Sequence, residues 1–561
     1  MNKQKRQNVV QLILVMSIII LINVISSFVF TRVDLTADKR FTLSNSSKEL
    51  VSTLKDVVYI KVYLEGDFPA GFTRLRNSTQ ELLDELRTHS KGNLEYQFID
   101  PSANPDIKER NNLYRQLAEK GLQPSNLEEK SNEGSSQKII FPGAIVSYSN
   151  REIPLQLLKD QLGTPPAQML NNSIQNLEYE ITDGIRKVTD PYKPSIGFIE
   201  GEGELDNRQV EDISNTLSAS YEIKRVRINE TLNSLDEFRA IIIAKPDSAF
   251  NEKDKFIIDQ YVMRGGKVIW LIDQMQVTMD SLSTKGETIA LARNLNIDDM
   301  LFRYGVRINY DLLLDLQSAP IPVVTGYIGN QPKQQLRPWF YFPVLTPFSQ
   351  HPIVNNLNSI RTQFISSIDT ITSPGVNKTI LLSTSKYTRV VSAPVRVSLG
   401  IMQLKPEPRQ YNNPNIPVAV LLEGNFQSLY KNRLLPEIES DSIIAFKEQS
   451  IKPTKMIVVS DGDMIRNDFS KGRAMALGYD KYSATSFGNK DLVQNMIDYL
   501  CDDNGLMSVR SKTYKLRLLD ATALQTHYTY LQIINCVIPI ILIMILGAIK
   551  FYLRKRKYAI N

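Results

Sequence analysis

The 561-residue sequence contains only two cysteines and three histidines. A disulfide scaffold is therefore excluded, and a metal site built from His and Cys is not expected. The sequence also lacks the phosphate-binding string G-x-x-x-x-G-K-[S/T] and the G-x-S-x-G turn of α/β-hydrolases. Hydrophobic residues make up 42% and charged residues 22%, which is typical of a globular protein rather than a disordered one.

The net charge of +6 resides in the two ends of the chain. Residues 1–30 carry +3 and residues 531–561 carry +5, so that residues 31–530 sum to −2. The long middle part therefore has no basic surplus of the kind that nucleic-acid binding requires.

Two uncharged stretches of 22 residues each, Val9–Phe30 and Tyr528–Ile549, lie near the ends. About 20 apolar residues span the hydrocarbon core of a bilayer, so both stretches are predicted to be transmembrane helices. A cleaved signal peptide is the alternative for the first stretch. Its apolar part is too long for one, and it ends in Phe28-Val29-Phe30 rather than in small residues.

The charges beside the two spans predict their orientation. Residues 1–8 carry Lys3, Lys5 and Arg6, and residues 550–561 form a basic tail. Positive flanks stay on the cytoplasmic side, so both termini are predicted to be cytoplasmic. In a bacterium, residues 31–527 would then lie in the periplasm, anchored to the inner membrane at both ends.

Residues 31–160 are predicted to form a first α/β domain, with the element order β-α-β-α-β-β. The residues 57–64 (VVYIKVYL) are typical of a strand, and Glu128–Gln137 is polar and is predicted to be a surface loop. The order of elements suggests a thioredoxin-like domain. No cysteine lies in this segment, which excludes a thiol redox role.

Residues 161–194 are predicted to be an amphipathic helix followed by a stiff linker, Asp190–Pro194. Apolar residues recur at spacings of three and four from Leu170 to Val188. This face packs either on its own domain or on a second copy or partner.

Residues 195–505 are predicted to form a second α/β domain in which strands alternate with helices around a parallel sheet. The proline-rich segment at about 280–450 is expected to be an insertion or a flanking subdomain. Residues 506–527 are then a return segment that leads to the second span.

Two acidic loops are the candidate ligand-binding sites. Glu200, Glu202 and Glu204 follow a predicted strand and precede a helix, and Asp461 and Asp463 follow another strand. Open α/β sheets bind ligands at such ends. A cation, a sugar hydroxyl or a basic side chain would suit the glutamates, and a hard cation would suit the aspartates. In the alternative interpretation both loops are solvated acidic turns.

No catalytic group is predicted, because Cys501 ends an amphipathic helix and the histidines are scattered along the chain. We expect neither an enzyme nor a bound cofactor.

Several strings resemble those of a known family, the GldG gliding-motility proteins of Bacteroidota. The resemblance begins directly after the first span and covers nearly the whole chain. The strings are Asp34-Leu35-Thr36 with Lys39–Ser44 (KRFTLS), Gly66–Phe72 (GDFPAGF), Phe98–Pro101 (FIDP), Gly201–Leu205 (GEGEL), Gly265–Asp273 (GGKVIWLID) and Ser460–Asn467 (SDGDMIRN).

This resemblance implies an auxiliary, so-called substrate-binding component of an ABC transporter. Its implied partners are a membrane permease (GldF-like) and a cytoplasmic ATPase (GldA-like). It also implies that the middle of the chain has a class I glutamine amidotransferase-like α/β fold without the catalytic cysteine, shared with intraflagellar-transport proteins.

The sequence thus predicts a non-enzymatic, membrane-anchored subunit of an ABC-transporter complex that supports gliding motility and couples the permease and ATPase to a periplasmic partner or ligand. The alternatives are a tethered receptor for a small polar or glycan ligand and a degenerate hydrolase that would depend on Cys501.

Overall fold

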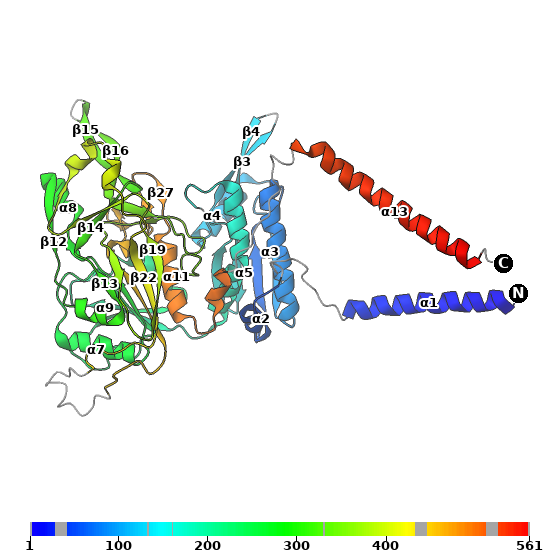
Figure 1. Ribbon diagram of the computed structural model, residues 1–561, viewed down its shortest axis with the longest axis horizontal. Coiled ribbons are helices and arrows are strands. Elements are labelled where there is room, and N and C mark those ends of the chain that lie inside the picture. Colours follow the sequence, from blue (N-terminus) through cyan, green and yellow to red (C-terminus); the bar gives the residue numbers. More distant parts are fainter. Residues whose placement is uncertain are drawn as a thin grey trace. The chain divides into compact units, whose positions relative to one another are not determined.

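A computed structural model describes residues 3–28, 42–131, 134–159, 161–328, 331–431, 446–511 and 526–558 (Figure 1). The chain divides into two compact units. One comprises Met1–Arg40 and Thr513–Asn561, and the other comprises Phe41–Lys512. The string Asp34-Leu35-Thr36 and the first half of the string that follows it, residues 39–41, lie outside the described residues.

The first unit contains two helices, α1 (Lys3–Phe28) and α13 (Tyr528–Tyr558). In α13 the 29 residues Tyr528–Arg556 are long and apolar enough to cross a membrane, and their side chains are not buried by the protein. In α1 the apolar part that the structure describes is shorter, Val10–Leu21. One apolar helix therefore supports a membrane anchor, and the N-terminal span stays a prediction.

The second unit begins with α2 (Asn45–Ser52), which Ser44 caps by accepting a hydrogen bond from the backbone N–H of Ser47 (3.1 Å). A four-stranded sheet follows, in the order β2-β1-β5-β6. Strand β1 pairs in parallel with β2 and antiparallel with β5. The bounds are β1 (Val58–Val62), α3 (Ala70–His89), β2 (Leu94–Phe98), α4 (Ile107–Glu119), β5 (Gly143–Tyr148), β6 (Arg151–Gln156) and α5 (Pro166–Thr189). The mixed α/β prediction is confirmed, whereas the name thioredoxin-like stays a prediction.

The polar segment Glu128–Gln137 corrects one expectation. Its described residues lie in an antiparallel hairpin of β3 (Ser125–Ser131) and β4 (Gly134–Ile140) rather than in a loop. The hydrogen bonds between paired strands join backbone groups. A polar sequence can therefore form a hairpin without the alternating apolar pattern by which strands are predicted.

Helix α5 packs within its own unit. Leu170, Leu177, Ile181, Ile185 and Val188 are buried in one cluster with the residues of the four-stranded sheet and of α3. The apolar face is therefore covered by the chain itself. The interpretation of this face as a seam with a second copy is wrong, because the face is not accessible.

A seven-stranded sheet forms the larger part of this unit, in the order β19-β22-β23-β10-β9-β7-β8. The strands from β23 to β8 pair in parallel, and β22 and β19 add antiparallel pairs. The bounds are β7 (Ser195–Glu200), β8 (Glu222–Arg227), β9 (Ala240–Ala244), β10 (Val268–Leu271), β19 (Val376–Ser383), β22 (Pro417–Gly424) and β23 (Thr454–Val459).

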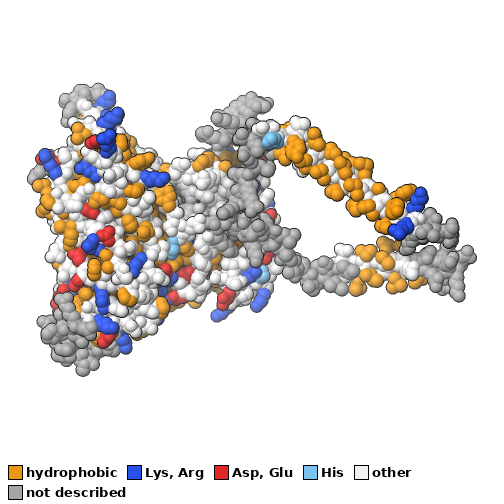
Figure 2. Space-filling model, in the orientation of Figure 1, with side chains coloured by type: hydrophobic (Ala, Val, Ile, Leu, Met, Phe, Trp, Pro, Cys, Tyr) orange, Lys and Arg blue, Asp and Glu red, His pale blue; other side chains and the backbone are white. Residues whose placement is uncertain are grey.

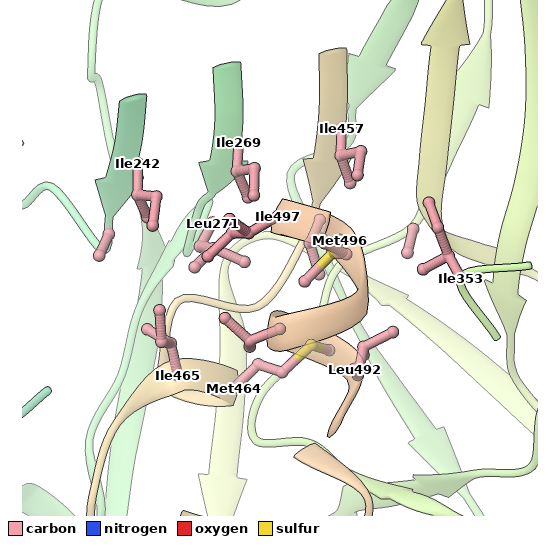
Figure 3. Close-up of a cluster of buried hydrophobic side chains, with 14 of the residues drawn as sticks. Ile242, Ile269, Leu271, Ile353, Ile457, Met464, Ile465, Leu492, Met496 and Ile497 are labelled. Atoms are coloured by element: carbon pink, nitrogen blue, oxygen red, sulfur yellow. The ribbon is translucent and has the colours of Figure 1, made fainter. Parts of the chain in front are cut away.

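Alternate side chains of these strands point to opposite faces, and helices cover both. On one face, α11 (Asn489–Cys501) and α6 (Glu211–Ser218) pack against residues such as Ile242, Ile269 and Ile457 (Figure 3). On the other face, α7 (Glu252–Met263) packs against residues that include Ile241, Trp270 and Val458. A sheet covered in this way explains the long apolar runs of its strands.

The predicted insertion at about 280–450 does not lie outside the sheet over its whole length, because β19 and β22 belong to it. Their buried runs, such as Val418 to Leu422, need neighbours on both faces. Most of the other elements surround a separate cluster that includes Trp339 and Phe342. They are β11 (Met275–Gln276), α8 (Met279–Lys285), β12 (Glu287–Ala292), β14 (Asp311–Asp315), β15 (Ser318–Ile328), β16 (Gln331–Leu345), β20 (Thr388–Ser392), β21 (Val395–Ser398) and η1 (Leu399–Gln403), with η2 (Pro408–Gln410) directly before the buried Tyr411. The remaining elements pack on the large sheet: α9 (Asp298–Tyr304), β13 (Val306–Ile308) and β18 (Ile368–Thr370) on the face that α7 covers, and β17 (Ile360–Arg361) on the face that α11 covers.

The remaining short elements lie after β23. They are η3 (Asp463–Ile465), β24 (Phe469–Ser470), β25 (Arg473–Ala474), β26 (Tyr479–Asp480), β27 (Thr485–Ser486) and η4 (Leu506–Ser511).

Buried polar contacts join α5 to the second α/β domain. The ammonium of Lys187 lies 3.0 Å from Asp498 of α11 and 2.7 Å from Asp183. The hydroxyl of Tyr221 donates to the other oxygen of Asp498 (2.6 Å). Tyr179 also lies on α5, and the centre of its ring is 5.1 Å from the buried guanidinium of Arg510. A buried polar joint therefore connects α5 to the second α/β domain.

Candidate functional site

The candidate site lies where the parallel strands end. Strands β7, β9, β10 and β23 are neighbours and run in the same direction, so the loops that follow them meet at one edge of the sheet. Ligands of open α/β sheets bind at this edge. Both predicted acidic loops are located here.

Three aspartates gather after β10 and β23. The carboxylate oxygens of Asp273, Asp461 and Asp463 lie within 4.8 Å of one another. Asp273 and Asp461 are fully buried, and Asp463 is nearly so. Three carboxylates at this separation repel one another strongly unless a cation or a proton compensates them.

Lys245, directly after β9, supplies that cation. Its ammonium lies 3.0 Å from Asp273 Oδ2 and 2.5 Å from Asp463 Oδ2. Burial opposes the charge of Lys245, but the attraction of the two carboxylates outweighs it and raises the pKa of this lysine. We call Lys245, Asp273, Asp461 and Asp463 the aspartate cluster.

Asp461 is held by backbone donors rather than by a charge. Its Oδ1 accepts from the N–H groups of Asp463 (2.8 Å) and Met464 (3.1 Å), and its Oδ2 accepts from Gln363 (3.0 Å). Burial, followed by the charges of Asp273 and Asp463, raises the pKa of Asp461 well above its usual range. Asp461 therefore shapes the loop, and its surroundings disfavour the charged form.

Gly462 allows this arrangement because the chain passes close to Lys245. A Cβ at position 462 would lie 2.6 Å from the Cβ of Lys245. The N–H of Gly462 donates to Asp273 Oδ1 (2.6 Å). A side chain here would separate the loops that hold the cluster together.

The glutamate loop after β7 is arranged differently. Glu200 pairs with the guanidinium of Arg225 (2.6 Å). The backbone N–H of Glu202 donates to Glu204 Oε2 (2.9 Å). Burial, followed by the charge of Glu204, raises the pKa of Glu202 to about 7, and burial raises the pKa of Glu204. We call Glu202 and Glu204 the glutamate pair.

The structure thus brings together Asp461 and Asp463, and separately Glu202 and Glu204. Within the described part of the chain, no hydrogen bond or ion pair links the glutamate pair to the aspartate cluster. The loop after β9 adjoins both, because the N–H of Asp247 donates to the carbonyl of Glu202 (2.8 Å) and Lys245 binds the aspartates.

Sequence reasoning missed Lys245 and Asp273. Both follow buried strands almost directly, after the apolar runs of β9 and β10. A polar residue at the end of a buried strand was therefore a signal, but only the strand order places these two beside Asp461 and Asp463.

The chemistry of the aspartate cluster is limited by Lys245. Three carboxylate oxygens could ligate a hard cation, but the ammonium already occupies the position between two of them. A metal or a cationic ligand would have to displace it. Among the residues that the structure describes, no ion pair joins the glutamate pair to a cation, so the two carboxyl groups can bind a shared proton.

Cys501 is not an activated nucleophile in this structure. Burial raises the pKa of its thiol to about 12, although nearby Lys267 opposes the shift. The reactive form of cysteine is the thiolate, which this environment disfavours.

Comparison with known proteins gives one family over the second α/β domain. Residues 193–496, just over half of the chain, match a family described as an ABC-type uncharacterized transport system. Residues 37–147 match a domain of unknown function. An uncharacterized protein of Borreliella burgdorferi is 21% identical over 564 residues, with 99% of each chain covered.

Two solved structures are similar at low scores. The mmIFT52 N-terminal domain is 14% identical, covers 55% of this chain and 96% of its own, and has a TM-score of 0.31. A ThuA-like protein from Parabacteroides merdae is 10% identical, covers 55% of this chain and 90% of its own, and has a TM-score of 0.25. At these TM-scores neither likeness carries a conclusion.

Proposed function

The chain belongs to the family of auxiliary components of an ABC-type uncharacterized transport system, and from this membership we propose that it is a non-enzymatic, membrane-anchored subunit of an ABC-transporter complex. The family match over the seven-stranded sheet is the observation that carries the proposal. The chain contains no phosphate-binding string for ATP. Energy would therefore come from an ATPase on another chain.

The apolar helix α13 supports the anchor. Its residues Tyr528–Arg556 are long and apolar enough to cross a bilayer, and none of the side chains in its most apolar stretch is buried in the protein. In the proposed topology α1 crosses the same inner membrane, both termini are cytoplasmic and residues 31–527 are periplasmic. The basic ends of both helices favour this orientation.

One face of α13 is suited to a partner helix. Gln532, Asn535 and Pro539 recur at spacings of three and four and therefore share a face. Amide groups inside a bilayer need hydrogen-bond partners, and neighbouring transmembrane helices supply them. We assign this face to contact with a GldF-like permease, which in turn binds a GldA-like ATPase.

In this proposal the subunit works by coupling. ATP-driven movement of the permease helices displaces the anchoring spans, and the α/β domains carry the movement to a periplasmic partner. Support of gliding motility is the process proposed for the complex.

Co-purification from membranes tests the proposal. A tagged full-length chain, solubilised in mild detergent after crosslinking in the membrane, should bring down a permease and an ATPase at a fixed ratio. In cells without the permease, the ATPase should be lost from the sample. Recovery of the chain alone from crosslinked membranes would contradict the proposal.

A pair of variants locates the contact. Asn535→Leu should lower the recovered permease about 3-fold, because one interhelical hydrogen bond in a bilayer contributes on the order of 0.6 kcal/mol. Val537→Leu lies about 160° away around the helix and should leave recovery unchanged. Equal recovery of the permease with both variants would contradict the assignment of this face to the permease contact.

A further inference from the structure

The C-terminal end of α13 is a cluster of cations without a counter-charge of its own. Lys550, Arg554, Lys555 and Arg556 are all exposed. Neither α13 nor α1 contains an aspartate or a glutamate. Figure 2 shows the hydrophobic side chains along α13 and the basic ones gathered at one end.

The length of α13 sets the depth of these cations. Twenty residues separate Tyr530 from Lys550, which is about 30 Å of helix and equals the hydrocarbon core. Tyr530 and Lys550 therefore fit the two boundaries of that core. Arg554 and Arg556 lie four and six residues farther on, about 6–9 Å along the axis. This is the depth of the headgroup layer, where lipid phosphates lie.

The residues between the cations favour the membrane surface over open water. Phe551 and Tyr552 are 71% and 65% exposed, and Leu553 follows them. Aromatic side chains beside a span prefer the interface between lipid and water. A contact with an acidic protein would not need large apolar side chains at this level.

We infer that Lys550 and Arg554 to Arg556 bind the phosphate groups of anionic lipids. Guanidinium groups bind phosphate through two parallel hydrogen bonds, and the lysine adds a point charge. The inference rests on the proposed membrane anchor and adds the class of lipid that the anchor selects.

Native mass spectrometry of the full-length protein tests this binding. The protein is reconstituted in nanodiscs of equimolar phosphatidylcholine and phosphatidylglycerol, and the lipids that remain bound are counted. The wild type should retain phosphatidylglycerol about 10-fold over phosphatidylcholine, because each basic residue near an anionic surface attracts it. The variant with all four cations changed to glutamine should lose most of this preference, with Lys557 and the basic residues at the start of α1 accounting for what remains.

A matched control separates this effect from net charge. Lys108, Arg115, Lys405 and Arg409 are exposed on the second unit, and changing these four to glutamine should leave the preference intact. Added inorganic phosphate should not displace the lipid, because a free ion lacks the bilayer that holds the headgroup in place. Displacement by phosphate would overturn a lipid site in favour of a simple anion site.

Two further outcomes distinguish the inference from its premise. If the wild type enters nanodiscs but shows no lipid preference, or if the glutamine variant keeps it, the lipid site is wrong and the anchor stands. If the protein does not enter nanodiscs at all, the anchor itself fails. Near-ultraviolet circular dichroism of each variant confirms that the second unit remains folded.

Discussion

The aspartate cluster and the glutamate pair occupy the same edge of one sheet, yet they manage their negative charge differently. The aspartate cluster contains its own cation, since Lys245 contacts Asp273 and Asp463. The glutamate pair contains none, and the pKa of Glu202 rises to about 7. An acidic loop at the end of a parallel strand is therefore not by itself a ligand site. Its significance depends on what compensates its charge.

Removal of Lys245 should lower the stability of the protein more than any other change to the two acidic loops. Lys245→Met would leave the buried Asp273 without its cation and Asp463 with Arg466 alone (3.3 Å), and breaking a buried pair in this way typically costs about 3–5 kcal/mol of unfolding free energy. Pulse proteolysis of the full-length protein in urea measures this loss. Lys405→Met, at an exposed position, should change the stability by less than about 0.5 kcal/mol. A loss as small as that of the control would mean that the cluster is not compensated by Lys245.

A side chain at position 462 should destabilise the aspartate cluster, because the backbone there passes close to Lys245. Gly462→Ala places a Cβ 2.6 Å from the Cβ of Lys245, and overpacking of this kind costs about 1–3 kcal/mol. Gly326→Ala is the matched control, because no atom lies within 4 Å of its added Cβ. Thermal unfolding of both variants checks the difference, and equal midpoints would contradict the close approach.

Neutralising Glu202 of the glutamate pair should stabilise the protein, whereas the changes to the aspartate cluster destabilise it. The folded-state pKa of Glu202 is raised from 4.5 to about 7. The wild type therefore binds more protons when folded and loses stability as the pH rises from about 4.5 through 7. Glu202→Gln should remove this loss, so it should stabilise the protein by about 1 kcal/mol at pH 8 and hardly at all at pH 4.5.

Thermal midpoints of the wild type and Glu202→Gln at the two pH values measure the effect. Glu200→Gln serves as the control, because Glu200 pairs with Arg225 and its loss should lower stability at pH 8. If both glutamine variants shift the midpoint in the same direction, the two glutamates do not differ in the way described here.

Divalent cations should have the smallest effect. With Lys245 in place, calcium at about 1 mM should shift the thermal midpoint of the wild type by less than about 1 °C, because binding must displace an ammonium. In Lys245→Met the same addition should raise the midpoint, since the position of the ammonium between Asp273 and Asp463 is then vacated. A large shift in the wild type would restore the aspartates as a metal site.

The sequence predicted those parts of the fold that depend on local apolar pattern. Such patterns predicted the strands β7 and β9 and the amphipathic helix α5. The hairpin of β3 and β4 did not, because its ladder consists of backbone hydrogen bonds between polar residues. The membership of β19 and β22 in the large sheet also depends on pairing across long loops, which no local pattern encodes.

The same limit applied to the candidate site. Asp461 and Asp463 were visible as neighbours in sequence, and so were Glu202 and Glu204. Lys245 and Asp273 come from loops far along the chain from Asp461, and only the order β9-β10-β23 brings them to it. An acidic motif can be read locally, but the cation that neutralises it cannot.

The joint between Lys187 and Asp498 bears on how this protein can be divided. The linker Asp190–Pro194 would be a natural place to cut, because one family match ends before it, at residue 147, and the other begins within it, at residue 193. A cut there would leave Lys187 in one fragment and Asp498 with Tyr221 in the other, each losing a buried partner. The fragment that ends at the linker would still pair Lys187 with Asp183, whereas the fragment that begins after it would keep a buried Asp498 without this lysine.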